Sequence, residues 1–171
     1  KNDLKDYLGA IADFSKAIEL NPQDAVAYYN RGVLKFILQD YRSATEGFNK
    51  AIELNPQYAE AYYNRGISKD TLQDYLGAIA DYTKAIELNP QYVEAYNSRG
   101  NSKHYLKDHL GAIADYTNAI ELNLKEAEVY KSRGISKTIL QDYSGAIADY
   151  NKAIELNPQD AVAYNNRILS K

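Results

Sequence analysis

The sequence has no cysteine, no tryptophan and no methionine, and it has only four prolines. Without cysteine there can be no disulfide, no thiolate metal site and no cysteine nucleophile. Lysine and arginine together number 20 against 23 aspartates and glutamates, so the formal net charge is −3. The basic surface that a nucleic-acid backbone requires is therefore not expected. No apolar run reaches the ~20 residues of a membrane-spanning helix, so membrane insertion is not expected either.

The chain begins at Lys1 and shows no signal peptide. We expect it to be part of a longer protein, so missing targeting signals carry little weight and the sequence names no compartment. What it does contain is apolar material, since 45% of the 171 residues are hydrophobic and 25% are charged. This composition excludes a disordered tail and is sufficient for a folded body.

The whole sequence repeats itself with one fixed period, which equals the separation of Tyr28 from Tyr62. The segment GAIADFSKAIELNP at 9–22 returns as GAIADYTKAIELNP at 77–90, as GAIADYTNAIELN at 111–123 and as GAIADYNKAIELNP at 145–158, with a looser copy at 43–56. The same step separates the members of a tyrosine, a glycine and an alanine column, which we interpret as structural. Those members are Tyr28, Gly32, Ala44, Tyr62, Gly66, Ala78, Tyr96, Gly100, Ala112, Tyr130, Gly134 and Ala146.

Each copy of the repeat predicts two helices. The apolar residues of 77–88 recur at the spacing of one helical face. Asp74 precedes them and suits an N-cap. The Asn89–Pro90 pair stops this helix, because a residue before proline avoids helical dihedrals, and the next helix is expected over about 92–106.

A single helical hairpin of this kind cannot bury its apolar face, so stacked neighbours must bury it. Gly100 has no side chain and lets a neighbouring helix approach closely. We expect about ten helices of roughly 13–15 residues, a usual length for helices of folded proteins. Neither β-strand pairing nor a closed globular core is expected. The predicted organisation is one array over 1–171, with full repeats at 25–58, 59–92, 93–126 and 127–160 between partial repeats at 1–24 and 161–171.

These columns resemble the tetratricopeptide repeat (TPR) family, whose repeats are about 34 residues long. Its loose signature is an aromatic, a small residue four positions on, a small residue twelve further on, then an aromatic, an alanine and a proline. The first full repeat fills it with Tyr28, Gly32, Ala44, Phe48, Ala51 and Pro56. The resemblance implies an all-α, right-handed α-solenoid of helix-turn-helix repeats that binds other proteins and is not an enzyme. Leu124 stands where other copies have proline, which predicts a softer turn or a longer helix.

In TPR arrays the first helix of each repeat lines a concave groove that accepts extended peptides or single helices. The resemblance places four variable columns in that groove. They are Val26, Glu60, Glu94 and Glu128; Tyr29, Tyr63, Asn97 and Lys131; Val33, Ile67, Asn101 and Ile135; and Phe36, Asp70, His104 and Thr138. The N-terminal part is apolar and aromatic and the middle is acidic, so we expect a protein or peptide partner with apolar residues and basic flanks. The alternative is that Val33 and Ile67 pack between helices and expose little.

An arginine column and an aspartate column share the period. The favoured interpretation is a structural ladder, in which each arginine pairs with an aspartate on an adjacent helix. The alternative is that the arginines face the groove and bind an acidic peptide. Gly47 stands in the aspartate column, so Arg31 is expected to turn to Asp13 or Glu46.

One TPR subclass clamps the C-terminal carboxylate of heat-shock chaperones with lysines and asparagines. Asn30 and Asn64 match one of its slots, but its lysine slots hold Glu60, Glu94 or Glu128 here. Because these glutamates would repel a terminal carboxylate, we do not interpret the chain as a carboxylate clamp.

Other chemistry finds no support in the sequence. His104 and His109 are five positions apart across a predicted turn, and we interpret them as a surface residue and a tyrosine substitute rather than as metal ligands. No phosphate-binding loop, nucleophile elbow or dinucleotide fingerprint is present. We therefore expect no catalytic residue, no metal and no cofactor.

Two alternatives to peptide binding remain. The predicted helix at about 7–20 lacks the helix that should cover Ala10, Phe14, Ala17 and Ile18, and the helix at about 161–171 lacks its own second helix. The last helix of one molecule would then dock on the first helix of the next, giving head-to-tail self-association. The array is alternatively a docking or regulatory arm of a larger enzyme.

Overall fold

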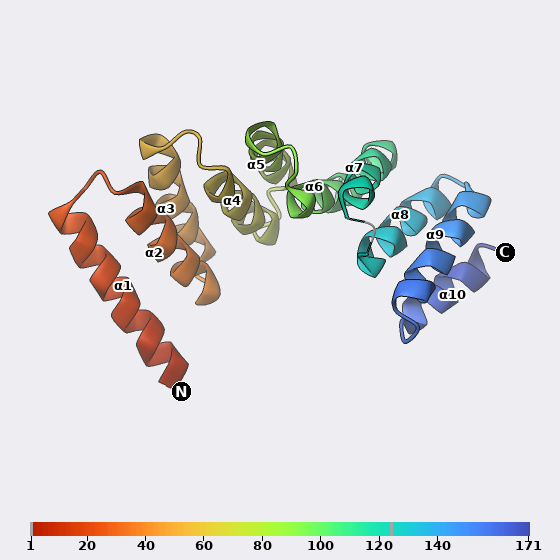
Figure 1. Cartoon of the computed structure of the whole chain (residues 1–171), viewed down its shortest axis with the longest axis horizontal. Coiled ribbons are helices and arrows are strands. Elements are labelled where there is room, and N and C mark those ends of the chain that lie inside the picture. The colour runs from red at the N-terminus through yellow and green to blue at the C-terminus, as the bar shows by residue number, and fades with distance from the viewer. Residues whose placement is uncertain (1, 124) are drawn as a thin grey trace. The chain divides into compact units, whose positions relative to one another are not determined.

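The computed structural model describes residues 2–123 and 125–171, and within them it contains ten α-helices and no β-strand. The helices are α1 (Asn2–Leu20), α2 (Ala25–Ile37), α3 (Tyr41–Leu54), α4 (Ala59–Thr71), α5 (Tyr75–Leu88), α6 (Val93–Tyr105), α7 (His109–Leu122), α8 (Ala127–Ile139), α9 (Tyr143–Leu156) and α10 (Ala161–Leu169) (Figure 1). This architecture confirms the predicted all-helical class. Helices α2 to α9 have the expected length, at 13 or 14 residues each. The expectation is wrong for α1, which has 19 residues, and for α10, which has 9.

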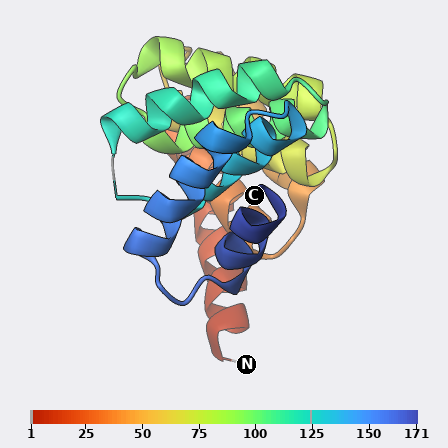
Figure 2. The same ribbon diagram turned by 90° about the vertical axis from the view of Figure 1, so that its right-hand side faces the viewer.

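The helices form two compact units, residues 1–90 and residues 91–171. In the first unit α2 packs on α3 and α4 packs on α5, so each pair is a helical hairpin; α1 covers α2, and α3 packs on α4. The second unit is built in the same way from the hairpins α6–α7 and α8–α9, with α7 packed on α8. In Figure 2 the C-terminal helices face the viewer, and α10 lies against α9.

Aspartate and asparagine residues mark where the second helix of each hairpin begins and ends. The Asp74 carboxylate accepts a hydrogen bond from the Gly77 N–H at 3.0 Å, which confirms the predicted N-cap. The same helix ends at Leu88 with Asn89 as its C-cap. Helix α7 likewise ends at Leu122, so the longer helix expected there is wrong, while Leu124 itself lies outside the described residues.

The turn inside each hairpin has a conformation that the sequence does not signal. Gln39, Gln73, Lys107 and Gln141 have φ between 62° and 65°, the left-handed region that usually favours glycine. In the first hairpin the Gln39 N–H donates to the Phe36 carbonyl and the Asp40 N–H donates to the Lys35 carbonyl. These two bonds satisfy carbonyls at the helix end in a Schellman motif. Asp40 then caps the next helix, so the turn that ends one helix also starts another.

The structural columns lie where the two helices of a hairpin meet. The alanine column is fully buried, whereas in the tyrosine column Tyr130 is buried and the other three members are half-buried. The aromatic residue of the second helix is buried more deeply, since Tyr82, Tyr116 and Tyr150 are each 1% exposed. A Cβ atom placed on Gly100 would lie 2.7 Å from a ring carbon of Tyr116, closer than such atoms approach one another. The other glycines of the column face the aromatic residue of their own hairpin in the same way. The glycine column is thus the point of closest approach in each hairpin.

Replacing Gly100 with leucine should therefore force α6 and α7 apart. We expect the free energy of unfolding to fall by about 1–3 kcal/mol, the usual effect of overpacking a core. A lowered thermal midpoint would show this. Gly9→Ala is the matched control, because a Cβ on Gly9 meets nothing within 4 Å. A Gly100→Leu midpoint equal to that of the parent would contradict the close-contact role.

Candidate functional site

The variable columns fall on two helical surfaces, one in each unit. Residues three, four and seven positions apart share one side of a helix, and α2 lies beside α4 as α6 lies beside α8. Face 1 comprises Val26, Tyr29, Val33, Phe36, Glu60, Tyr63, Ile67 and Asp70 on α2 and α4. Face 2 comprises Glu94, Asn97, Asn101, His104, Glu128, Lys131, Ile135 and Thr138 on α6 and α8.

Face 1 is centred on an immobilised tyrosine. The Tyr29 hydroxyl accepts a hydrogen bond from the Asn64 amide at 2.8 Å. Its ring lies 4.7 Å from the ring of Tyr58 and 5.8 Å from that of Phe48, measured between centroids. Burial, and then the nearby Glu60 carboxylate, raise the pKa of Tyr29. Tyr29 is thus a neutral aromatic held in one orientation.

The apolar residues around Tyr29 differ in exposure. Val26 is 54% exposed, whereas Val33 and Ile67 are half-buried. The Phe36 ring packs edge-on against Tyr41 with centroids 5.1 Å apart. Val33 and Ile67 therefore contribute to packing, while the start of α2 presents an apolar residue to solvent.

Face 2 is polar, and many of its side chains already have partners. The Lys131 ammonium lies 2.7 Å from the Glu128 carboxylate and 2.9 Å from the Asp160 carboxylate. The Asn101 side-chain oxygen accepts a hydrogen bond from the Tyr116 hydroxyl at 2.8 Å. Glu128 is therefore paired with a lysine of its own repeat, which it shares with Asp160.

His104 is half-buried, so part of its side chain lies at the surface and part of it packs between helices. Its Nδ1 lies 3.0 Å from the Ser136 hydroxyl on α8. The His109 ring is close, at 4.9 Å between centroids. Desolvation, and then His109, lower the pKa of His104. Among the described residues no three histidine, cysteine or acidic side chains cluster closely enough to hold a metal ion.

The glutamate column has a structural role that sequence reasoning missed. Helices α2 and α10 begin with Asp24 and Asp160, whose carboxylates accept backbone N–H bonds. The N-cap residues of α4, α6 and α8 make no such side-chain bond, and each of these helices carries a glutamate in its first turn. A negative charge there interacts favourably with the helix dipole, by about 0.3–1 kcal/mol. The sequence could have indicated this role, because glutamate occurs in the first-turn column of the helices whose N-cap column lacks aspartate.

The predicted ladder of arginines and aspartates forms in three repeats, at Arg65, Arg99 and Arg133, whereas Arg167 donates to Asn151. The Arg65 guanidinium donates to both carboxylate oxygens of Asp81, and the Lys69 ammonium lies 2.8 Å from the same carboxylate. Each guanidinium also lies over the tyrosine three positions before it, as Arg65 does over Tyr62 at 5.4 Å from the ring centroid. These aspartates are buried, so the arginines serve packing between helices rather than the peptide groove.

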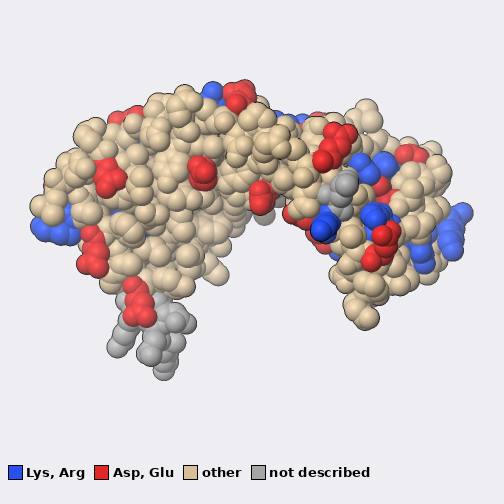
Figure 3. Space-filling view, viewed as in Figure 1, with Lys and Arg blue, Asp and Glu red and all other residues tan. Residues whose placement is uncertain are grey.

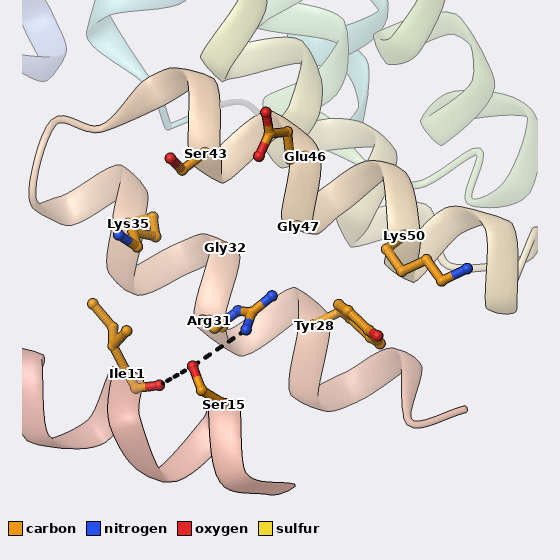
Figure 4. Close-up of a pocket in the computed structure, with 10 residues that line it drawn as sticks. All are labelled: Ile11, Ser15, Tyr28, Arg31, Gly32, Lys35, Ser43, Glu46, Gly47 and Lys50. Carbon is orange, nitrogen blue, oxygen red and sulfur yellow. Dashed lines mark hydrogen bonds between the residues drawn. The ribbon is translucent and has the colours of Figure 1, made fainter. Parts of the chain in front are cut away.

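Arg31 departs from the ladder. Within the described residues neither Asp13 nor Glu46 lies within ion-pair distance of it, so the partners expected from the sequence are wrong. Its guanidinium donates to the Ser15 hydroxyl at 3.2 Å instead. Beside it is a cavity of about 340 Å³ between α1, α2 and α3 (Figure 4).

The surface charges are mixed. The side of the molecule drawn in Figure 3 shows acidic residues scattered singly over the first unit, with basic residues at its edge, and both signs interspersed on the second, with no continuous basic stripe. None of the described helices combines the length and the apolar character that crossing a bilayer demands.

Comparison with known proteins places the chain among repeat proteins. A model of the tetratricopeptide repeat matches residues 25–58, 59–92 and 127–160, a second tetratricopeptide repeat model matches 93–126, and a TPR repeat model matches 2–38. No curated protein matches the chain.

Three solved structures illustrate the likeness. The crystal structure of MamA is 25% identical, with a TM-score of 0.88, over 95% of each chain. YrrB, described as a TPR protein with an unusual peptide-binding site, is 25% identical with a TM-score of 0.84 over 92% of this chain and 81% of its own. The first TPR of Spaghetti bound to the HSP90 peptide SRMEEVD is 27% identical with a TM-score of 0.65 over 67% of this chain and 90% of its own. The helix pairs described above pack as they do in TPR solenoids.

The lowered pKa of His104 predicts a pH dependence of stability. As the pH falls, the His104 imidazole is protonated near pH 6.5 in the unfolded chain and only at a lower pH in the folded chain. The contribution of His104 is therefore complete above pH 6.5 and is lost as the pH falls from 6.5 through the lower folded pKa. The thermal midpoint of the wild type should drop more between pH 7.5 and pH 5 than that of His104→Gln, which keeps a hydrogen-bonding group for Ser136. Equal drops would contradict the burial of His104.

Proposed function

The chain belongs to the tetratricopeptide repeat family, and we propose that this protein-interaction scaffold binds a peptide segment, extended or helical, along the first helices of its repeats. The observation that carries the proposal is the arrangement around Tyr29. A hydrogen bond and two aromatic neighbours hold this ring beside the exposed Val26, with the Glu60 carboxylate nearby. A rigid aromatic next to an exposed apolar residue loses little conformational entropy when a ligand packs on it.

The charge of each face favours a partner with basic flanks. Glu60 on face 1 and Glu94 on face 2 are exposed carboxylates at corresponding positions of α4 and α6. The peptide bound by Spaghetti, SRMEEVD, is acidic at its C-terminal end. Exposed glutamates would repel such a ligand and attract lysine or arginine, so we propose an apolar segment flanked by basic residues.

A peptide-library selection against the whole chain tests this proposal. We expect the selected peptides to combine apolar and basic residues and to bind more weakly as salt rises, because salt screens exposed charges. Tyr29→Ala should weaken a peptide that lies on face 1. Among charge reversals, Glu60→Lys or Glu94→Lys should weaken binding about tenfold, equivalent to ~1.4 kcal/mol. Glu128→Lys should have less effect, because Lys131 already pairs with Glu128.

The matched control for these charge reversals is Glu87→Lys. Glu87 is exposed on α5, lies outside both faces, and pairs with Lys84 at 3.0 Å, so its reversal changes the net charge equally. Circular dichroism of each variant excludes unfolding as the cause of lost binding. Selection of acidic peptides, or an equal loss in the control, would refute the proposal. A docking arm of a larger enzyme would use the same surface and faces the same test.

Head-to-tail self-association is the second candidate function. On α10, Ile168 is 62% exposed and Leu169 is 80% exposed, which gives one end of the second unit an apolar surface. At the other end the expected exposure is only partly present, because Ile18 is buried while Ala10 and Phe14 are half-buried.

Sedimentation at several concentrations tests this candidate. If the ends of two molecules dock, the apparent mass of the wild type should rise with concentration. Deletion of 161–171 should abolish the rise, and so should the substitution Leu169→Lys, which leaves the chain length unchanged. Association that survives both changes would exclude docking through α10.

A further inference from the structure

Three repeats hold one buried aspartate between an arginine and a lysine. Asp115 accepts hydrogen bonds from Arg99 Nε at 2.9 Å and Arg99 Nη2 at 2.7 Å, while the Lys103 ammonium lies 2.8 Å from the same carboxylate. The sets Arg65–Lys69–Asp81 and Arg133–Lys137–Asp149 have the same contacts. In each set one carboxylate satisfies two cations, through a two-pronged arginine contact and an ammonium contact.

The first full repeat keeps the two cations and lacks the carboxylate. Arg31 and Lys35 occupy the cation positions, and Gly47 stands one repeat before Asp81 in the aspartate column. Arg31 also keeps the contact on its other side, since its Nη1 donates to Ser15. Arg65 Nη1 donates to Asn49 at the corresponding position, and Arg133 Nη1 donates to Thr117. The Arg31 guanidinium is therefore held as in the other repeats, with its remaining edge turned toward Gly47.

A cavity occupies the space beside that edge. Its volume is about 340 Å³, and its lining includes Arg31, Lys35, Ser43, Glu46, Gly47 and Lys50 (Figure 4). At roughly 30 Å³ per water molecule this is room for about ten waters, so a small polar group fits without displacing protein atoms. The cavity lies within the first unit and uses no residue of face 1.

The charged groups around the cavity leave Arg31 without a carboxylate. Lys35 has turned to Asp40, at 3.4 Å, a longer contact than the 2.8 Å that Lys69 makes to Asp81. Lys50 pairs with the exposed Glu53 at 2.6 Å. Glu46 lines the wall, yet within the described residues it makes no ion pair with Arg31 or Lys35. Among the three cations that line the cavity, Arg31 is therefore the one that has no ion-pair partner within the described residues.

We propose that this cavity binds a carboxylate group supplied from outside the chain, held by Arg31 and Lys35 as Asp81 is held by Arg65 and Lys69. The group is either a free small carboxylate or a glutamate or aspartate side chain of a partner. A partly buried guanidinium without a counter-ion is unfavourable, so a carboxylate bound at Arg31 supplies what the missing aspartate supplies elsewhere. This inference is independent of the peptide-binding proposal, because the two sites share no residue.

Acetate is the probe for a first experiment. In the 15N-labelled whole chain, the Nε–Hε signal of Arg31, identified with Arg31→Lys, is followed while acetate replaces chloride at constant ionic strength. We expect a saturable shift with a dissociation constant of roughly millimolar order. Lys35→Gln should raise the half-saturating concentration about tenfold, the effect expected for losing one charged contact.

Two further variants control the assignment. Gly47→Asp would supply the carboxylate internally and should abolish the acetate response. A Cβ on Gly47 would lie 3.1 Å from the Tyr28 carbonyl oxygen, so α2 and α3 must shift slightly to admit it. If the Gly47→Asp variant does not fold, the acetate titration of Lys35→Gln tests the site instead. Conversely, Asp81→Gly removes the carboxylate that Arg65 and Lys69 share, as Gly47 does for Arg31 and Lys35. This variant should show a second arginine Nε–Hε signal that responds to acetate.

The source of the carboxylate is separated by comparing ligands. A blocked peptide with one glutamate, the same peptide with glutamine, acetate and inorganic phosphate are titrated in parallel. Tighter binding of the glutamate peptide than of acetate identifies a partner side chain, and equal binding identifies a free carboxylate; both support the site. Tighter binding of phosphate, or a shift that never saturates, overturns it. So does a Glu46→Gln variant that gains an acetate response absent from the wild type, because Glu46 would then be the native occupant.

Discussion

The contact on which the structure depends is that of a glycine backbone against an aromatic ring. In the α6–α7 hairpin, Gly100 has no side chain to separate the two helices, so the fully buried Tyr116 ring packs on the opposing backbone. The contact recurs once in every full repeat and sets the same separation and register in each hairpin. The repeated ion pairs between the two helices of a hairpin require that register.

The ion-pair ladder is the clearest consequence of this register. Burying an aspartate is unfavourable unless its charge is fully compensated. Asp81 meets that condition because Arg65 contributes two N–H groups and Lys69 an ammonium, all from the first helix of the same hairpin. Removing one member of such a set is strongly destabilising, by about 3–5 kcal/mol. Where Gly47 removes the carboxylate, a solvent-filled opening rather than a tighter core is the physically consistent outcome.

Except for the left-handed turn residue, the features that repeat were predictable from the sequence, and the features peculiar to one repeat were not. The period, the Asp74 cap and the aspartate–arginine ladder could be predicted because several copies carried the same signal. The left-handed Gln39 could not, because the hydrogen bonds of the turn impose that conformation on a residue with no preference for it. The contact of His104 with Ser136 depends on which way one side chain points, and the partner of Arg31 depends on how far its neighbours reach. Both are properties of packing that residue spacing does not contain.

Comparing the same position in different repeats shows which charged side chains stabilise the fold and which are left accessible to a partner. Glutamates appear in the first turn where the cap lacks a carboxylate, so the charge of Glu60 and Glu94 is explained by helix starts before any ligand is invoked. Their exposure still leaves that charge accessible to a basic partner. Arg31 is the opposite case, because the arginine at its position pairs with an aspartate in the next three repeats, whereas Arg31 has no carboxylate partner among the described residues. The first unit thus presents an acidic, aromatic surface and a separate cavity that is lined by this arginine. A single partner that carried both basic flanks and a carboxylate would engage the two without competition between them.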